Sequence, residues 1–183
     1  MNRSSTGERR DFVDHLIAQW ERERPDLEAR LMAVPGRIRR IARLIDRRLE
    51  ETWGRFGLGQ GGFDVLAALR RAGPPHRLSP TELYRALLLS SGAMTNRIDR
   101  LEEAGLVVRE PDPEDRRGVL VGLTPKGKEV VDQAVVAVVD AYRELFAPLT
   151  PEEWEILASL LRKVLGHLWR RPVPPPEGGV EEG

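Results

Sequence analysis

The sequence predicts a mainly α-helical protein with a small β wing, an α+β fold class. Over most of the chain, apolar residues recur at three- to five-residue steps, which is typical of helices with one buried face. Residues 106–123 depart from that period, because two short apolar runs flank a segment with two prolines, as in a β-hairpin. We therefore expect helices on both sides of one hairpin.

The composition limits the class of protein. The chain has 183 residues, is 40% hydrophobic and has no net charge, so it can bury a core and gives no support for a nonspecific polyanion binder. It has no cysteine, which excludes disulfides, thiolate metal sites and cysteine redox sensing. No apolar run approaches the roughly 20 residues of a membrane span, and residues 1–12 lack the apolar segment of a secretory signal. We expect a cytoplasmic protein without a membrane partner.

The first third of the chain predicts helices separated by breaks. Residues 8–32 have helical spacing, with Pro25 as a kink or break, and residues 34–53 form a second helix. The glycine-rich run 54–62 predicts a loop, and the next helix begins at Phe63.

Capping signals mark three later helix starts. In residues 79–82, SPTE, the serine caps free amides, the proline fits the first turn and the glutamate reaches back. Residues 150–153, TPEE, repeat this arrangement, and Thr124-Pro125 is a weaker version. The last two signals begin two long helices with broad apolar faces. We expect these faces to be buried within the protomer and also against a second copy.

Two short helices before the hairpin predict a helix-turn-helix that reads DNA. The first helix is residues 80–87 and the second is residues 91–104, with Met94, Ile98 and Leu101 facing inward. The N-terminal part of the second helix meets base edges, where asparagine pairs with adenine and arginine with guanine or phosphate. The candidate DNA-contacting residues on this helix are Ser91, Ala93, Thr95, Asn96, Arg97 and Arg100.

The hairpin that follows is the expected wing. Its strands are residues 106–110 and 119–123, and two prolines stiffen the loop between them. Arg116 and Arg117 at the tip are candidates for the narrow minor groove, where the negative potential is enhanced. We expect Asp115 to pair with an arginine and shape the tip. Taken alone, the second helix would be an ordinary solvated helix and the hairpin an ordinary charged hairpin. Because the hairpin follows that helix directly, we favour DNA binding.

The motifs SSGAMTNRIDR and LEEAGLVVREPDPEDRRGVLVGLTPKG together resemble the MarR family of ligand-responsive transcription regulators, over residues 34–168. The resemblance implies a homodimer formed by the terminal helices, a palindromic operator in double-stranded DNA, repression, and release by a small ligand. Half-sites would lie about one helical turn, ~34 Å, apart. It implies no enzyme, and the sequence has no nucleophile elbow, phosphate loop or dinucleotide fingerprint.

The leading helix is similar to the extra N-terminal helix of the urate-responsive subgroup. The subgroup's four ligand residues match Trp20, Asp64, Arg97 and Arg109, whereas Phe63 replaces a tryptophan that often precedes the aspartate. The resemblance implies an effector such as urate or a related aromatic anion, with the indole and two guanidinium groups as its donors. Each residue also has an ordinary explanation without a ligand. Trp20 would be a core residue, Asp64 would complement the dipole of its helix from the first turn, and Arg97 would contact a DNA phosphate.

The expected organisation has five segments. They are a disordered N-terminus (1–7), helices for dimerisation and the ligand pocket (8–60), the winged helix-turn-helix (61–123), dimerisation helices (124–170) and a disordered tail (171–183). We expect no cofactor and no catalytic or metal site, because the three histidines lack metal-ligand spacing. The alternatives are another phenolic ligand, a metal at His15 or His167 with nearby carboxylates, and a winged module for protein contacts without DNA binding.

Overall fold

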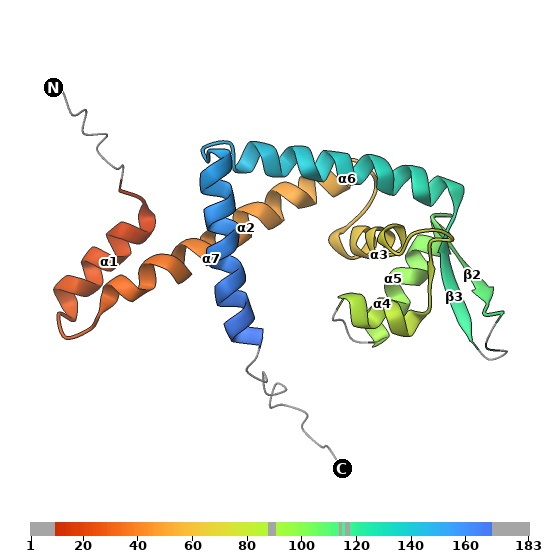
Figure 1. Cartoon of the computed structure of the whole chain (residues 1–183), viewed down its shortest axis with the longest axis horizontal. Helices are drawn as coiled ribbons and strands as arrows, with labels where there is room; N and C mark the ends of the chain where they lie inside the picture. Colours follow the sequence, from red (N-terminus) through yellow and green to blue (C-terminus); the bar gives the residue numbers. More distant parts are fainter. Residues whose placement is uncertain (1–9, 88–90, 114, 116–117, 170–183) are drawn as a thin grey trace, which may run out of the picture. The chain divides into compact units, whose positions relative to one another are not determined.

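The computed structural model describes residues 10–87, 91–113, 115 and 118–169, without the side chains of residues 91–93. The segments 1–7 and 171–183 therefore lie outside the described residues. Contacts divide the chain into two units, residues 1–142 and 143–183. The elements in chain order are α1 (Phe12–Glu23), a 3-10 helix η1 (Ala29–Met32), α2 (Ala33–Gly54), α3 (Gln60–Arg71), β1 (Arg77–Leu78), α4 (Pro80–Leu87), α5 (Ser91–Glu103), β2 (Val107–Pro111), β3 (Val119–Leu123), α6 (Pro125–Leu145) and α7 (Pro151–Trp169) (Figure 1).

These elements confirm the predicted fold class, mainly helical with a small antiparallel sheet. No helix in the part of the chain that the structure describes is long and apolar enough to cross a membrane.

The N-terminal segment breaks at its proline as predicted. The Asp11 carboxylate caps α1 by accepting from the amides of Val13 and Asp14, at 2.7 and 3.1 Å. The helix ends at Glu23, two residues before Pro25, and η1 leads into α2. Arg37 of α2 then pairs with Asp11 and Asp14 at 2.9 and 2.8 Å, which fixes α1 against α2.

The glycine-rich loop is shorter than predicted. Helix α3 begins at Gln60, so Gly61 and Gly62 belong to its first turn and not to a loop that lasts until Phe63. A Cβ at Gly61 would collide with the Arg97 guanidinium, which lies directly against the helix. Glycine thus permits a close approach inside a helix, although its usual effect in a sequence is to weaken one.

All three capping signals are confirmed. The Glu82 amide donates to the Ser79 hydroxyl at 3.2 Å, and Glu82 accepts from the Ser79 amide at 2.7 Å. In residues 150–153 the Glu153 amide donates to the Thr150 hydroxyl at 3.2 Å, and Glu153 accepts from the Thr150 amide at 2.8 Å. The Thr124 hydroxyl accepts from the Gly127 amide at 2.9 Å. Helices α4, α6 and α7 each begin at the proline that follows the cap.

The wing is a three-stranded sheet and not a two-stranded hairpin. Strands β2 and β3 are antiparallel, with Arg109 opposite Val121. On its other edge β3 pairs with β1, a two-residue strand that the sequence analysis missed, in the order β1-β3-β2. The extra strand links the wing to the segment that enters α4, so the sheet belongs to the body of the first unit.

The core lies between the helix-turn-helix, the sheet and α6. Its most completely buried large side chains come from α3, α4, α5, β3 and α6: Leu66, Leu69, Leu83, Ile98, Val121 and Val131. Met94 and Leu101 of α5 are buried beside them, which confirms the predicted inner face of that helix. Helix α7 differs, because none of its residues is buried in the protomer.

One glycine controls the junction between the wing and α6. Gly127 lies so close to the Leu106 carbonyl that a Cβ would overlap its oxygen, and the backbone would have to move. We expect Gly127→Ala to lower the free energy of unfolding by about 1–3 kcal/mol, the typical effect of overpacking. Urea denaturation followed by circular dichroism measures this difference.

The matched control is Gly54→Ala in the last turn of α2, where nothing lies within 4 Å of an added Cβ. Alanine there removes a flexible helix residue, so stability should stay the same or rise by up to about 1 kcal/mol. Equal effects of the two substitutions would contradict the close approach at Gly127.

Candidate nucleic-acid interface and effector site

Helix α5 presents one face to the core and another to solvent. Met94, Ile98 and Leu101 anchor the inner face, whereas Thr95, Asn96 and Arg100 are exposed. Ser91 and Ala93 belong to the first turn, but their side chains lie outside the described residues. The exposed face therefore includes three of the six residues predicted to meet DNA, on a helix whose orientation is fixed by its buried face.

Arg97 lies between the exposed and buried faces of α5. Its guanidinium lies against Gly61 of α3 and is partly buried. Its charge also acts on Asp64, one turn along α3. In this protomer Arg97 connects the recognition helix to α3.

Asp64 is a half-buried acid on the first turns of α3. Burial raises the pKa of its carboxyl, and the positive charges of Arg97 and Arg71 offset part of that increase. The pKa of the Tyr142 hydroxyl on α6 is also raised, first by burial and then by the charges of Asp64 and Asp46. Asp64 thus interacts electrostatically with Arg97 of α5 and with Tyr142 of α6, and these three residues are called the Asp64 cluster.

Trp53 packs on Phe63, the neighbour of Asp64 in the chain, and the sequence analysis missed it because there it is only the last apolar residue of a helix. Its side chain is 4% exposed and stacks on Phe63, with ring centroids 5.5 Å apart. Phe63 immediately precedes Asp64. Within the described residues the buried indole N–H of Trp53 has no acceptor. An unsatisfied buried donor is costly, and a ligand acceptor would relieve that cost.

The structure does not bring all four predicted ligand residues together. Trp20 is 44% exposed on α1, which packs against η1 and α2. No hydrogen bond, ion pair or ring contact among the described residues joins it to Asp64, Arg97 or Arg109. Only Asp64 and Arg97 are neighbours in the protomer.

Arg109 connects the wing to the recognition helix. From β2 its guanidinium contacts both Asp99 and Glu102 of α5, and its backbone amide donates to Glu102 at 3.0 Å. Burial lowers the pKa of Arg109, but its bonds to the two carboxylates outweigh burial and raise the pKa above the ordinary value. Arg97 extends from α5 to α3, and Arg109 reaches α5 from β2, so both residues restrain the position of this helix.

The tip of the wing is described only in part. Gly118 donates to the Asp115 carbonyl at 2.8 Å and accepts from the Asp112 amide at 3.0 Å, which closes the loop. Arg116 and Arg117 lie outside the described residues, so their contact with a minor groove stays a prediction, as does an Asp115–arginine pair. No group of three potential metal-ligating side chains occurs in the described part of the chain, where His15 and His167 both lie.

Comparisons with known proteins agree on one family. A model of the MarR family matches residues 56–118. The chain is 38% identical over 156 residues to the transcriptional regulator PecS of Dickeya dadantii, which covers 85% of this chain and 94% of PecS.

Two solved structures extend the comparison. A mutant of MarR from Escherichia coli, complexed with operator DNA, has a TM-score of 0.65 and 35% identity, covering 76% of this chain and 99% of that one. The second is BpsR from Bordetella bronchiseptica, whose DNA binding is described as regulated by 6-hydroxynicotinic acid. It has a TM-score of 0.62 and 30% identity, and the match covers 72% of this chain and 91% of the BpsR chain.

The raised pKa of Asp64 has a consequence for stability. At neutral pH the folded protein holds a carboxylate that burial disfavours, so we expect Asp64→Asn to raise Tm. As the pH falls through the raised pKa toward the ordinary value of 3.8, the wild-type carboxyl binds a proton in the folded state first. The difference in Tm between Asp64→Asn and the wild type should therefore become smaller at lower pH and disappear below the ordinary pKa. Thermal unfolding across pH 3–8 measures the difference.

Asp46→Asn is the matched control, because Asp46 is exposed on α2. A lower Tm of Asp64→Asn at neutral pH would contradict the prediction, and would mean that pairing with Arg97 exceeds the effect of burial.

Proposed function

Because this chain is a member of the MarR family of winged-helix, DNA-binding transcription regulators, we propose that it is a homodimeric repressor. It binds a palindromic operator and is released by a small aromatic anion, with urate as the first candidate. One observation supports this function above the others: a single helix, α5, has an exposed DNA-facing side and also contributes Arg97 to the Asp64 cluster.

The proposed operator contacts follow from the anchoring of α5. Asn96 and Arg100 extend from a helix that cannot rotate without exposing Ile98 and Leu101. Asparagine reads adenine with two hydrogen bonds, and arginine reads guanine or neutralises phosphate. The MarR–operator complex supports this assignment, because its chain shares the fold over 76% of this one.

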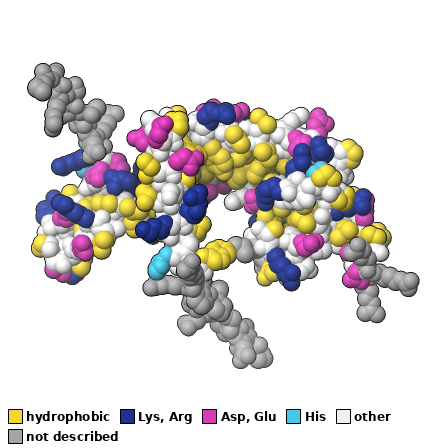
Figure 2. Space-filling model, in the orientation of Figure 1, with side chains coloured by type: hydrophobic (Ala, Val, Ile, Leu, Met, Phe, Trp, Pro, Cys, Tyr) yellow, Lys and Arg dark blue, Asp and Glu magenta, His cyan; other side chains and the backbone are white. Residues whose placement is uncertain are grey.

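The proposed homodimer accounts for the apolar surface. Hydrophobic side chains reach the surface over helices of both units (Figure 2). The large ones exposed by at least half are Phe12, Leu31, Val34, Leu44, Val136, Ile156, Leu160, Leu165, Leu168 and Trp169. Monomeric proteins rarely expose so many large apolar side chains, so α7, η1 and the start of α2 are the proposed contacts with a second copy, whereas Phe12 and Leu44 line a cavity between α1 and α2. Two copies would also match the two halves of a palindrome.

The proposed effector site is the Asp64 cluster, with the unpaired Trp53 N–H as a further donor. An anion entering here would compete with Asp64 for Arg97 and repel the carboxylate. Because Arg97 is part of α5, its movement would shift the helix that reads DNA, which gives two sites one shared element. BpsR, whose described regulator is a small ring with a carboxylic acid, supports an effector of this chemistry.

The alternative effector is another phenolic ligand. Phe63 occupies the position before Asp64 and stacks on Trp53, so the aromatic wall here differs from that implied by the urate-responsive pattern. The same titration with a panel of phenols and purines separates the candidates.

We expect Asn96→Ala to weaken operator binding by about 5- to 150-fold, the equivalent of 1–3 kcal/mol for one lost bidentate contact. Fluorescence anisotropy with DNA from upstream of the chain's own gene measures this. Gln133→Ala, exposed on α6, is the control and should bind as the wild type does. Affinity that is absent, or independent of salt and sequence, would contradict operator binding and favour a protein-interaction module.

We expect urate to release the wild-type protein from this DNA. Arg97→Lys keeps the charge but loses the planar fork, so half-release should need about tenfold more urate. Trp20→Phe and Trp53→Phe, compared with each other, identify the indole that donates to the ligand. If neither urate nor any other purine or phenol affects binding, the effector proposal is wrong and operator binding still stands.

A further inference from the structure

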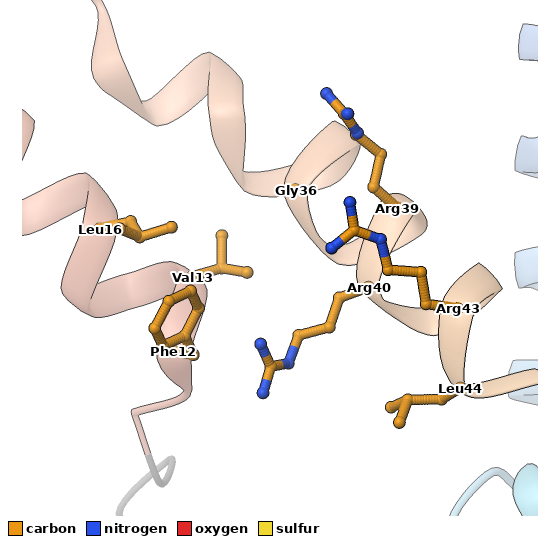
Figure 3. A pocket seen from close by; sticks show the side chains of 8 residues that line it. All are labelled: Phe12, Val13, Leu16, Gly36, Arg39, Arg40, Arg43 and Leu44. Atoms are coloured by element: carbon orange, nitrogen blue, oxygen red, sulfur yellow. The ribbon is translucent and has the colours of Figure 1, made fainter. Parts of the chain in front are cut away.

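A cavity lies between α1 and α2. Its volume is about 390 Å³, within the range of roughly 300–1,000 Å³ found for small-molecule sites. Four apolar side chains, one glycine and three arginines line it: Phe12, Val13, Leu16, Gly36, Arg39, Arg40, Arg43 and Leu44 (Figure 3). None of them belongs to the cluster at Asp64.

One wall of the cavity is positively charged. Arg40 and Arg43 extend from α2 into the space that faces Phe12, Val13 and Leu16 (Figure 3). Arg39, Arg40 and Arg43 form no ion pair with any carboxylate of the described residues. Arg37, on the same helix, is neutralised by Asp11 and Asp14. The three lining guanidiniums therefore keep their positive charge available, and an anion between them would be stabilised.

The opposite wall is apolar. Phe12 and Leu16 of α1 line it and are 54 and 40% exposed, and Val13 is buried against Gly36. Leu44 adds an apolar side chain from α2, beside the arginines. The Arg40 guanidinium lies 4.8 Å from the centroid of the Phe12 ring, a cation–π distance. A ligand that fills this space needs a hydrophobic body for one wall and a negative group for the other.

The walls are held in place before any ligand arrives. The two ion pairs of Arg37 join the start of α1 to α2, at 2.9 and 2.8 Å. A Cβ at Gly36 would stand only 3.0 Å from Val13 Cγ1, so the helices are already in tight contact there. Binding would therefore require little ordering of the protein.

We propose that this cavity is a second small-molecule site, selective for a monocarboxylate with a ring-sized apolar body. A guanidinium fork matches the geometry of a carboxylate, and the apolar wall excludes small inorganic anions from competing on equal terms. The site is independent of the effector proposed at Asp64 and does not require DNA binding.

The test is isothermal titration calorimetry of the full chain with 2-naphthoate and its neutral analogue 2-naphthamide. We expect the acid to bind at least tenfold more tightly than the amide. The double variant Arg40→Gln/Arg43→Gln should lose this preference, and Leu16→Gln should weaken both ligands. The matched control Arg47→Gln, on the same helix with an 82% exposed side chain, should bind as the wild type does.

The double variant also separates the two sites, because naphthoate bound at the Asp64 cluster would be unaffected by Arg40→Gln/Arg43→Gln, whereas naphthoate bound between α1 and α2 would be lost. Circular dichroism confirms that each variant is folded. No naphthoate binding to the wild type, equal affinity for acid and amide, or full affinity in the folded double variant would each overturn the proposal.

Discussion

The burial of Met94, Ile98 and Leu101 is the interaction on which the DNA-reading surface depends. Removing one large apolar side chain from water contributes about 1.5–3 kcal/mol, so these three fix the rotation of α5 about its own axis. The outward side of the helix needs no stabilising contacts of its own. It can use polar residues for recognition because the inner side supplies the stability.

The same helix is also held on its flanks by charge. Arg109 attaches Asp99 and Glu102 to the wing, and Arg97 extends from α5 to Gly61 and Asp64 on α3. Apolar packing is insensitive to small anions, whereas ionic contacts respond to them directly. The apolar inner face of α5 therefore keeps the helix folded, whereas a charged ligand can change the ionic contacts of Arg97 and Arg109. This combination suits a DNA-binding element whose position is regulated.

Local signals in the sequence predicted the helix starts at Pro80, Pro125 and Pro151, the break before Pro25 and the inner face of α5. Each depends on residues within one or two turns. The wrong or missed features depend on distant partners. Gly61 leaves room inside α3 for Arg97, thirty-six residues later, and that use of a glycine cannot be read from its neighbours in the chain. Strand β1 exists because β3 offers it an edge, and two residues are too few to show a period. Which charges pair with Arg109, and which indole packs on Phe63, likewise depend on the folded arrangement.

The stacking of Trp53 on Phe63 gives the molecule an optical property. Trp53 is 4% exposed, while Trp20, Trp154 and Trp169 are 44, 42 and 70% exposed. In the single protomer, iodide or acrylamide can collide with those three indoles but is kept from Trp53. In a protomer, the fluorescence that survives such a quencher therefore comes from Trp53, and its wavelength and intensity follow changes around the Phe63 ring without any attached dye.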